Sequence, residues 1–173
     1  MRTPASIAGH PIHPMLITLP IGLWIFSLVC DSVVFFSHTE ATQILWFALA
    51  YYTMAGGLVG ALLAAIPGLI DFLSIERPPI RKLAATHMAI NLTVVALYAV
   101  NLWLRTSVPP SADIGFGLSI LGVVLIIISG WIGAEMVHVH GIGVSMPGEA
   151  TPAAKTEVAR DERPHSGSRL GST

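Results

Sequence analysis

The chain has 173 residues, of which 53% are hydrophobic and only 11% charged, and its formal net charge is -1. Soluble domains average roughly 45–50% apolar and about 25% charged residues, so this composition indicates a membrane protein. The near-neutral charge excludes the basic surface that binds nucleic acid. The single cysteine, Cys30, excludes an intrachain disulfide and the paired cysteines that attach c-type haem.

Four stretches are long and apolar enough to cross a bilayer as helices. A span needs about 20 mostly apolar residues, because in hydrocarbon only a helix satisfies its own backbone hydrogen bonds. The predicted spans cover residues 14–36, 43–66, 84–104 and 114–137. Their connections are short, so consecutive helices are expected to pack antiparallel. We therefore predict an all-α fold, an up-down bundle of four transmembrane helices, within a domain of residues 1–146.

Proline and glycine residues mark the expected helix ends. Pro67 and Gly68 are expected to end the second helix, and Pro78 and Pro79 to lie in the loop before the third. The first span is too long for the apolar region of a cleavable signal peptide, so it is expected to remain in the mature protein. Residues 147–173 are rich in Pro, Gly, Ser and charges, which predicts a disordered cytoplasmic tail.

Lysine and arginine residues in the short loops predict the orientation. Arg2 precedes the first helix and Arg77, Arg81 and Lys82 lie in the second loop, whereas the opposite side carries only Arg105. Cytoplasmic loops hold the excess of basic residues, so both termini are predicted to be cytoplasmic.

Ionisable residues gather at one end of the predicted bundle. The first helix begins, the second ends, the third begins and the fourth ends at the same membrane face. Such residues near hydrocarbon are costly unless paired, hydrated or ligated, so their convergence indicates a binding site. Any one of them alone is more commonly a boundary residue whose polar edge reaches water. The set comprises His10, His13, Asp71, His87, Glu135, His138 and His140.

Two local patterns refine this prediction. In the segment HPIHP, proline follows both His10 and His13, which holds the imidazoles at the start of the first helix; the same pattern also fits a helix-start signal with interfacial histidines. Glu135 and His138 form E-x-x-H, but a di-iron bundle needs two such motifs and further glutamates. A zinc protease would need H-E-x-x-H.

Small and polar residues inside the spans predict helix contacts. Glycines on the second and fourth helices create smooth faces where backbones approach closely, and such faces also leave room for a flat macrocycle. Polar residues within the spans are expected to face the bundle interior and to form hydrogen bonds across helices. The glycines are Gly56, Gly60, Gly130 and Gly133, and the polar residues are Asp31, Asn91, Thr93 and Asn101.

Several of these segments resemble a known family. GHPIHPML, AAIPGLIDF, THMAIN and GWIGAEMVHVHGIGV are similar to the bacterial four-helix membrane proteins catalogued as domain of unknown function 2231, over residues 8–146. The resemblance implies a small inner-membrane protein of uncharacterised function. Members are sometimes joined to a Rieske-type iron–sulfur domain, which implies redox chemistry. This chain has no iron–sulfur cysteines, so such a domain would be a separate partner.

Two functions follow from these observations. In the first, histidines from different helices ligate haem b or a transition metal near one membrane face and serve electron transfer. In the second, the protein is a non-catalytic scaffold or small transporter subunit, as a monomer or a homodimer, whose polar vestibule responds to protons. Against transport, the sequence shows no broken helix and no inverted repeat. The predicted ligands are His13 and His87 first, then His138, His10 and His140, with Asp71 and Glu135 as orienting or alternative ligands.

Overall fold

The computed structural model describes residues 3–106 and 112–144. The predicted tail of residues 147–173 lies outside this part of the chain. Within it, four helices are long and apolar enough to cross a membrane, which confirms the predicted all-α bundle. The elements are β1 (Ser6–Ile7), β2 (His10–Pro11), α1 (Ile12–Leu16), α2 (Thr18–Phe36), α3 (Glu40–Leu73), α4 (Pro78–Arg105) and α5 (Ala112–His138).

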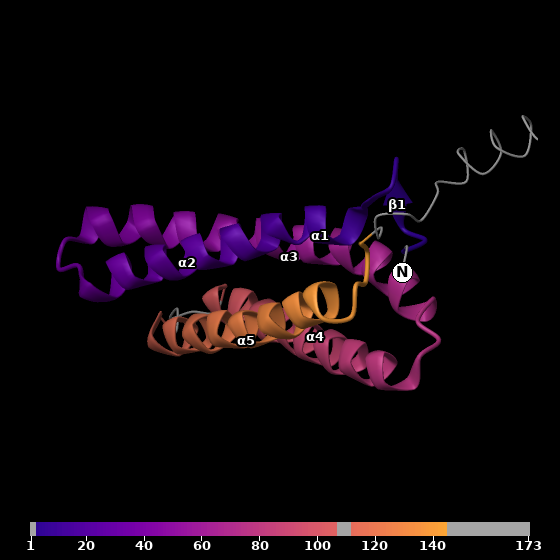
Figure 1. The fold of residues 1–173 in the computed structure, drawn as a ribbon. Helices are drawn as coiled ribbons and strands as arrows, with labels where there is room; N and C mark the ends of the chain where they lie inside the picture. The colour runs from indigo at the N-terminus through magenta and orange to yellow at the C-terminus, as the bar shows by residue number, and fades with distance from the viewer. Residues whose placement is uncertain (1–2, 107–111, 145–173) are drawn as a thin grey trace, which may run out of the picture.

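The helices form two antiparallel pairs. Figure 1 shows α2 lying along α3, and α4 lying along α5. The short helix α1 leads directly into α2, because the Ile17 N–H still donates to the His13 carbonyl across the junction. We call helices α1 to α3 hairpin A and helices α4 and α5 hairpin B. The two short strands pair as an antiparallel ribbon before α1.

Two proline predictions are wrong. Helix α3 continues through Pro67 to Leu73, and α4 begins at Pro78, whereas these positions were expected to end one helix and to lie in a loop. A proline inside a membrane helix removes one backbone hydrogen bond, but neighbouring helices compensate, and Pro67 is buried here. Proline in the first turn costs nothing because that N–H has no partner within the helix.

The outer surface of the bundle is apolar. Trp131 is 78% exposed, and Phe36 and Tyr52 are each 72% exposed. In water such exposed apolar side chains would favour aggregation, whereas a bilayer solvates them. The interior is correspondingly small, because lipid replaces much of the packing that a soluble bundle needs.

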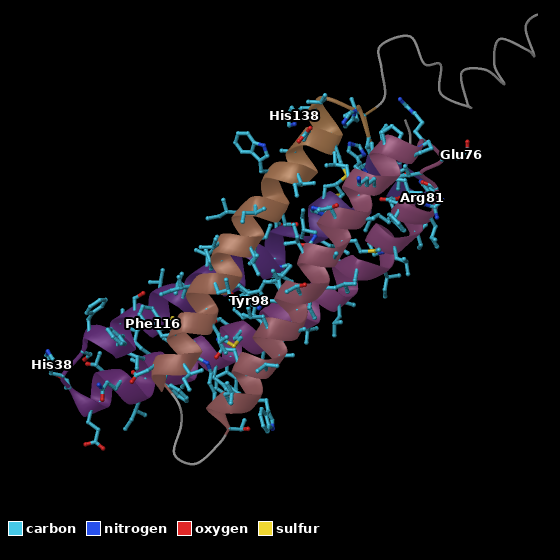
Figure 2. All side chains as sticks on the ribbon, turned by 90° about the horizontal axis from the view of Figure 1, so that it is seen from below. His38, Glu76, Arg81, Tyr98, Phe116 and His138 are labelled. Atoms are coloured by element: carbon cyan, nitrogen blue, oxygen red, sulfur yellow. The ribbon has the colours of Figure 1, made fainter. Side chains whose placement is uncertain are left out.

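The core centres on two stacked aromatic rings. Trp24 of α2 and Tyr98 of α4 have ring centroids 4.3 Å apart and planes inclined by only 4°, so the stack joins the two hairpins. Met54, Val94 and Ile126 surround it. Figure 2 shows Tyr98 midway along the bundle.

Glycines make room for these rings. A methyl group on Gly57 would collide with the Trp24 indole, and one on Gly122 would lie 2.6 Å from the Tyr98 ring. Among the glycines predicted to lie at helix contacts, a methyl group added to Gly56 or Gly60 would lie 3.3 or 3.2 Å from an α2 side chain. Gly130 is different, because a methyl group there would meet nothing within 4 Å. Close approach is therefore confined to glycines on the inner faces.

This difference predicts unequal effects of alanine. Gly57→Ala and Gly122→Ala should each lower the free energy of unfolding by about 1–3 kcal/mol, because the added methyl overpacks the aromatic stack. Gly130→Ala, the matched control, should be neutral or slightly stabilising through helix propensity. Thermal unfolding of the detergent-purified protein measures all three, and equal melting temperatures would contradict the packing described here.

Candidate functional site

His13 is fixed by a contact between α1 and α3. Its Nδ1 lies 2.8 Å from the Ala64 carbonyl oxygen. One turn further along α3, Gly68 leaves space for the ring, since a methyl group there would lie 2.8 Å from the same nitrogen. The imidazole therefore occupies the place that a larger side chain on α3 would take.

His87 has the same kind of environment in hairpin B. Its Nδ1 lies 2.9 Å from the Ser129 carbonyl oxygen of α5. One turn further along α5, a methyl group on Gly133 would lie 3.3 Å from the His87 ring. The same geometry, a histidine bonded to a carbonyl and accommodated by a glycine four residues later, thus occurs in both hairpins.

The two imidazoles meet between the hairpins. The ring centroids of His13 and His87 are 6.5 Å apart and the ring planes are perpendicular, at 89°. Both side chains are half-buried. The predicted first ligand pair is therefore brought together at the junction of the two hairpins, although the sequence places its members in different helices.

Hydrogen bonding fixes the tautomers. A carbonyl oxygen only accepts, so Nδ1 carries the proton in both neutral rings and Nε2 carries the lone pair. The lone pair of His87 accepts from Asn91 Nδ2 at 2.9 Å. Asn91 Oδ1 accepts from the Ser129 hydroxyl, whose oxygen lies 2.9 Å from His87 Nδ1. These three side chains form a closed ring, whereas His13 Nε2 has no hydrogen-bond partner among the described residues.

The other predicted site residues lie around the same end of the bundle but do not join the pair. Figure 2 shows His138 at the end where Glu76 and Arg81 lie, far from His38. His138 is exposed and its Nδ1 lies 3.0 Å from the Ala134 carbonyl of its own helix. His10 and Glu135 are also exposed, and His140 is half-buried in the turn after α5.

Asp71 forms its hydrogen bond with the backbone near the N-terminus. Its Oδ1 accepts the Ala5 backbone N–H at 3.0 Å and so anchors the strand ribbon against the end of α3. Across the described ranges, no hydrogen bond or ring contact joins Asp71, His10, Glu135, His138 or His140 to the pair. No group of three or more His, Cys, Asp or Glu residues in these ranges is arranged to hold a metal ion.

A second polar cluster lies at the opposite end. Asp31 and Arg105 form an ion pair at 2.6 Å, with side chains 5% and 3% exposed. Ser119 donates to the same carboxylate oxygen at 2.7 Å, and Asn101 accepts from Arg105 Nε at 3.2 Å. Charges at this depth are tolerated because each has a partner.

The cluster corrects two expectations. Arg105 was assigned to a loop, but it is buried at the end of α4, where Asp31 binds it and the Phe47 ring lies 5.5 Å from its guanidinium carbon. Thr93 was expected to face the interior, but it is exposed and donates to the Ala89 carbonyl of its own helix. The inward orientation of Asp31 and Asn101 is confirmed.

The family described as "Predicted membrane protein (DUF2231)" matches residues 9–146. The chain belongs to this family. The match begins before β2 and ends after α5, so both imidazoles and the ion pair of this DUF2231 chain lie within the family domain. No curated protein and no solved structure matched the chain.

Ser129 was missed by sequence reasoning. It stands in the apolar run LIIISGW, and its only signal is a single hydroxyl one turn before Gly133. Its carbonyl and its hydroxyl both contact His87, so it positions this imidazole more than any residue that the sequence singled out.

The closed ring around His87 yields a stability prediction. Asn91→Leu leaves His87 Nε2 without a donor and the Ser129 hydroxyl hydrogen without its acceptor, which should cost about 1–3 kcal/mol of unfolding free energy. Thr93→Val on the same helix removes an exposed hydroxyl and should change little. Thermal unfolding in detergent compares the two variants, and a Thr93→Val protein that melts as low as Asn91→Leu would refute the role of the ring.

Proposed function

We propose that this protein binds haem b, which His13 and His87 would hold, and serves electron transfer near one membrane face. The observation that carries the proposal is the matched geometry of the two imidazoles. Each Nδ1–H is held by a main-chain carbonyl, which leaves Nε2 as the potential ligand atom. Histidines that bind metals are commonly oriented through the other ring nitrogen in this way.

The separation of the rings fits a shared metal atom. A metal–imidazole bond is about 2.0–2.1 Å long, so two imidazoles that would hold one metal must lie close together. The observed separation is 6.5 Å. The two rings also come from different hairpins, so a ligand between them would be held from both sides.

The number of protein ligands favours haem over a bare ion. A structural or catalytic transition-metal site uses three or four protein ligands, and the described residues contain no such group. A porphyrin supplies four nitrogens of its own, so two histidines complete the coordination, and when bound it supplies one-electron redox chemistry. The role of the chain is to hold two neutral imidazoles and to exclude water.

One contact works against the proposal and defines a second candidate. His87 Nε2 already accepts from Asn91, so ligation requires the amide to move away. As it stands, His87 is satisfied without any metal. This observation favours a non-catalytic scaffold or small transporter subunit in which the imidazole pair is part of a polar vestibule.

An absorption spectrum separates the two candidates. The protein, expressed with ample haem and purified in detergent, should show sharp Soret and α bands after dithionite reduction. Both bands should be lost in His13→Ala and in His87→Ala, because each removes a side chain that would hold the haem. His138→Ala is the matched control, since this exposed histidine lies at the same end, and it should keep the full spectrum.

Two other outcomes have different meanings. A folded wild-type protein without these bands would overturn the haem proposal and favour the scaffold or transporter candidate. A spectrum that His138→Ala abolishes and His13→Ala preserves would mean that haem binds elsewhere. Because electron transfer needs a second redox centre, we further propose a separate partner, such as an iron–sulfur protein.

We also infer that the imidazole pair lies near the cytoplasmic face of a bacterial inner membrane, with both termini cytoplasmic. Arg81 and Lys82 are exposed near the start of α4, and Figure 2 shows Arg81 at the end of the bundle where His138 lies. Because Arg105 is buried in the ion pair, the loops of the His38 end contain no Lys or Arg. This supports the orientation more strongly than the sequence count did.

Reporter fusions measure this orientation. A phosphatase that is active only in the periplasm should be inactive when fused after Thr173 and active when fused within the loop at His38. The reverse pattern would place the imidazole pair at the periplasmic face.

A further inference from the structure

Among the side-chain contacts that join hairpin A to hairpin B, three share one spacing. Each pairs a residue of α1 or α2 with a residue of α4. In each pair the two partners are 74 positions apart in the chain. The pairs are the perpendicular imidazoles His13 and His87, the stacked rings Trp24 and Tyr98, and the ion pair Asp31 and Arg105.

A second constant spacing connects the helices within each hairpin. Side chains on α1 or α2 donate to carbonyls of α3, and side chains on α4 donate to carbonyls of α5. The carbonyl acceptors in hairpin B lie 65 positions after the equivalent acceptors in hairpin A. The glycines that make room for the rings obey the same spacing. The equivalent acceptors are Ala50 and Gly115, Met54 and Ser119, and Ala64 and Ser129, and the equivalent glycines are Gly57 and Gly122, and Gly68 and Gly133.

These spacings define a symmetry. When equivalent residues of two copies contact each other, they lie next to the two-fold axis that relates the copies, one on each side of it. Both hairpins run in the same direction, so this axis is parallel to the helices and to the membrane normal, as in proteins built from parallel repeats. The imidazoles lie on it at one end, the aromatic stack near the middle and the ion pair at the other end.

We propose that the chain is two copies of one helical hairpin, and that the ion pair on their axis specifies which hairpins associate. On a two-fold axis each residue meets its own equivalent. Two copies of hairpin A would bring Asp31 against Asp31, and two copies of hairpin B would bring Arg105 against Arg105. Like charges buried together are strongly unfavourable, whereas Asp31 against Arg105 is paired.

The pairing rule has a consequence for the imidazole pair. Hairpin A selects hairpin B, either from its own chain or from a second copy of the chain, and rejects another hairpin A. Every permitted pairing therefore brings one His13 to one His87. The inference does not depend on haem, since it concerns how the hairpins recognise each other.

Charge exchange tests the pairing rule in the full chain. Asp31→Arg and Arg105→Asp should each shift the folding equilibrium by more than about a hundredfold towards the unfolded state, because each places two like charges on the axis. The double exchange restores opposite charges at equivalent positions. It should recover at least about tenfold relative to either single variant. Asp113→Arg reverses an exposed charge of α5 near the same end and should have no comparable effect.

Thermal unfolding and size-exclusion profiles in detergent measure the stability of each variant, and neither measurement requires a bound cofactor. Recovery in the double variant supports the proposal. Single variants as stable as the wild type, or a double variant no better than the worse single variant, would overturn the role of the ion pair. Loss of haem bands in an otherwise stable protein would bear only on the proposed function.

A second exchange tests the repeat without moving a charge. Trp24→Tyr combined with Tyr98→Trp should keep nearly wild-type stability, because Gly57 and Gly122 provide equivalent space for either ring. Tyr98→Ala, which removes the stack, is the reference for loss of stability. An exchanged protein as unstable as Tyr98→Ala would overturn the equivalence of the two positions.

Discussion

The whole structure depends on one constraint, that a polar group in hydrocarbon must find a partner inside the protein. Side chains on one helix of each hairpin meet it by donating to main-chain carbonyls of the next helix. In hairpin A, His13, Trp24 and Ser27 donate to carbonyls of α3. Such bonds hold the helix axes close together, and that closeness requires glycine wherever a ring lies against the neighbouring backbone. Hydrogen bonding and glycine placement therefore have a common cause.

The same constraint separates the two ends of the bundle. At one end the polar groups are two imidazoles, each held by a main-chain carbonyl, and His87 also contacts an amide. At the other end they are full charges, and burial at 5% exposure or less is tolerable only because Asp31 and Arg105 neutralise each other. Between them the Trp24 and Tyr98 stack fills the core with apolar surface. The aromatic core thus separates the imidazole pair from the ion pair.

The sequence predicted the features that follow from the requirements of the bilayer, and it failed where the position of a residue depends on a tertiary contact. The four spans followed from hydropathy, and topology alone placed His13 and His87 at one level. Arg105 was assigned to a loop because a basic residue at the end of an apolar span is typical of a loop, and its carboxylate partner Asp31 is distant in the sequence. The prediction for Pro67 was wrong because the tendency of proline to end helices applies to water-soluble proteins, whereas a membrane helix tolerates it. The repeat stayed hidden because the hairpins use different residues for equivalent contacts, as with Trp24 and Tyr98, so only the contacts show it.

The departures from two-fold symmetry are informative around the imidazole pair. By the spacing of 74, Ile17 stands where hairpin B has Asn91, and by the spacing of 65, Ala64 stands where it has Ser129. Hairpin A therefore lacks both polar side chains that enclose His87. His13 offers its lone pair without displacing a partner, whereas His87 does so only when Asn91 withdraws. The proposed ligation of both imidazoles would therefore break the Asn91 hydrogen bond in hairpin B and no equivalent bond in hairpin A.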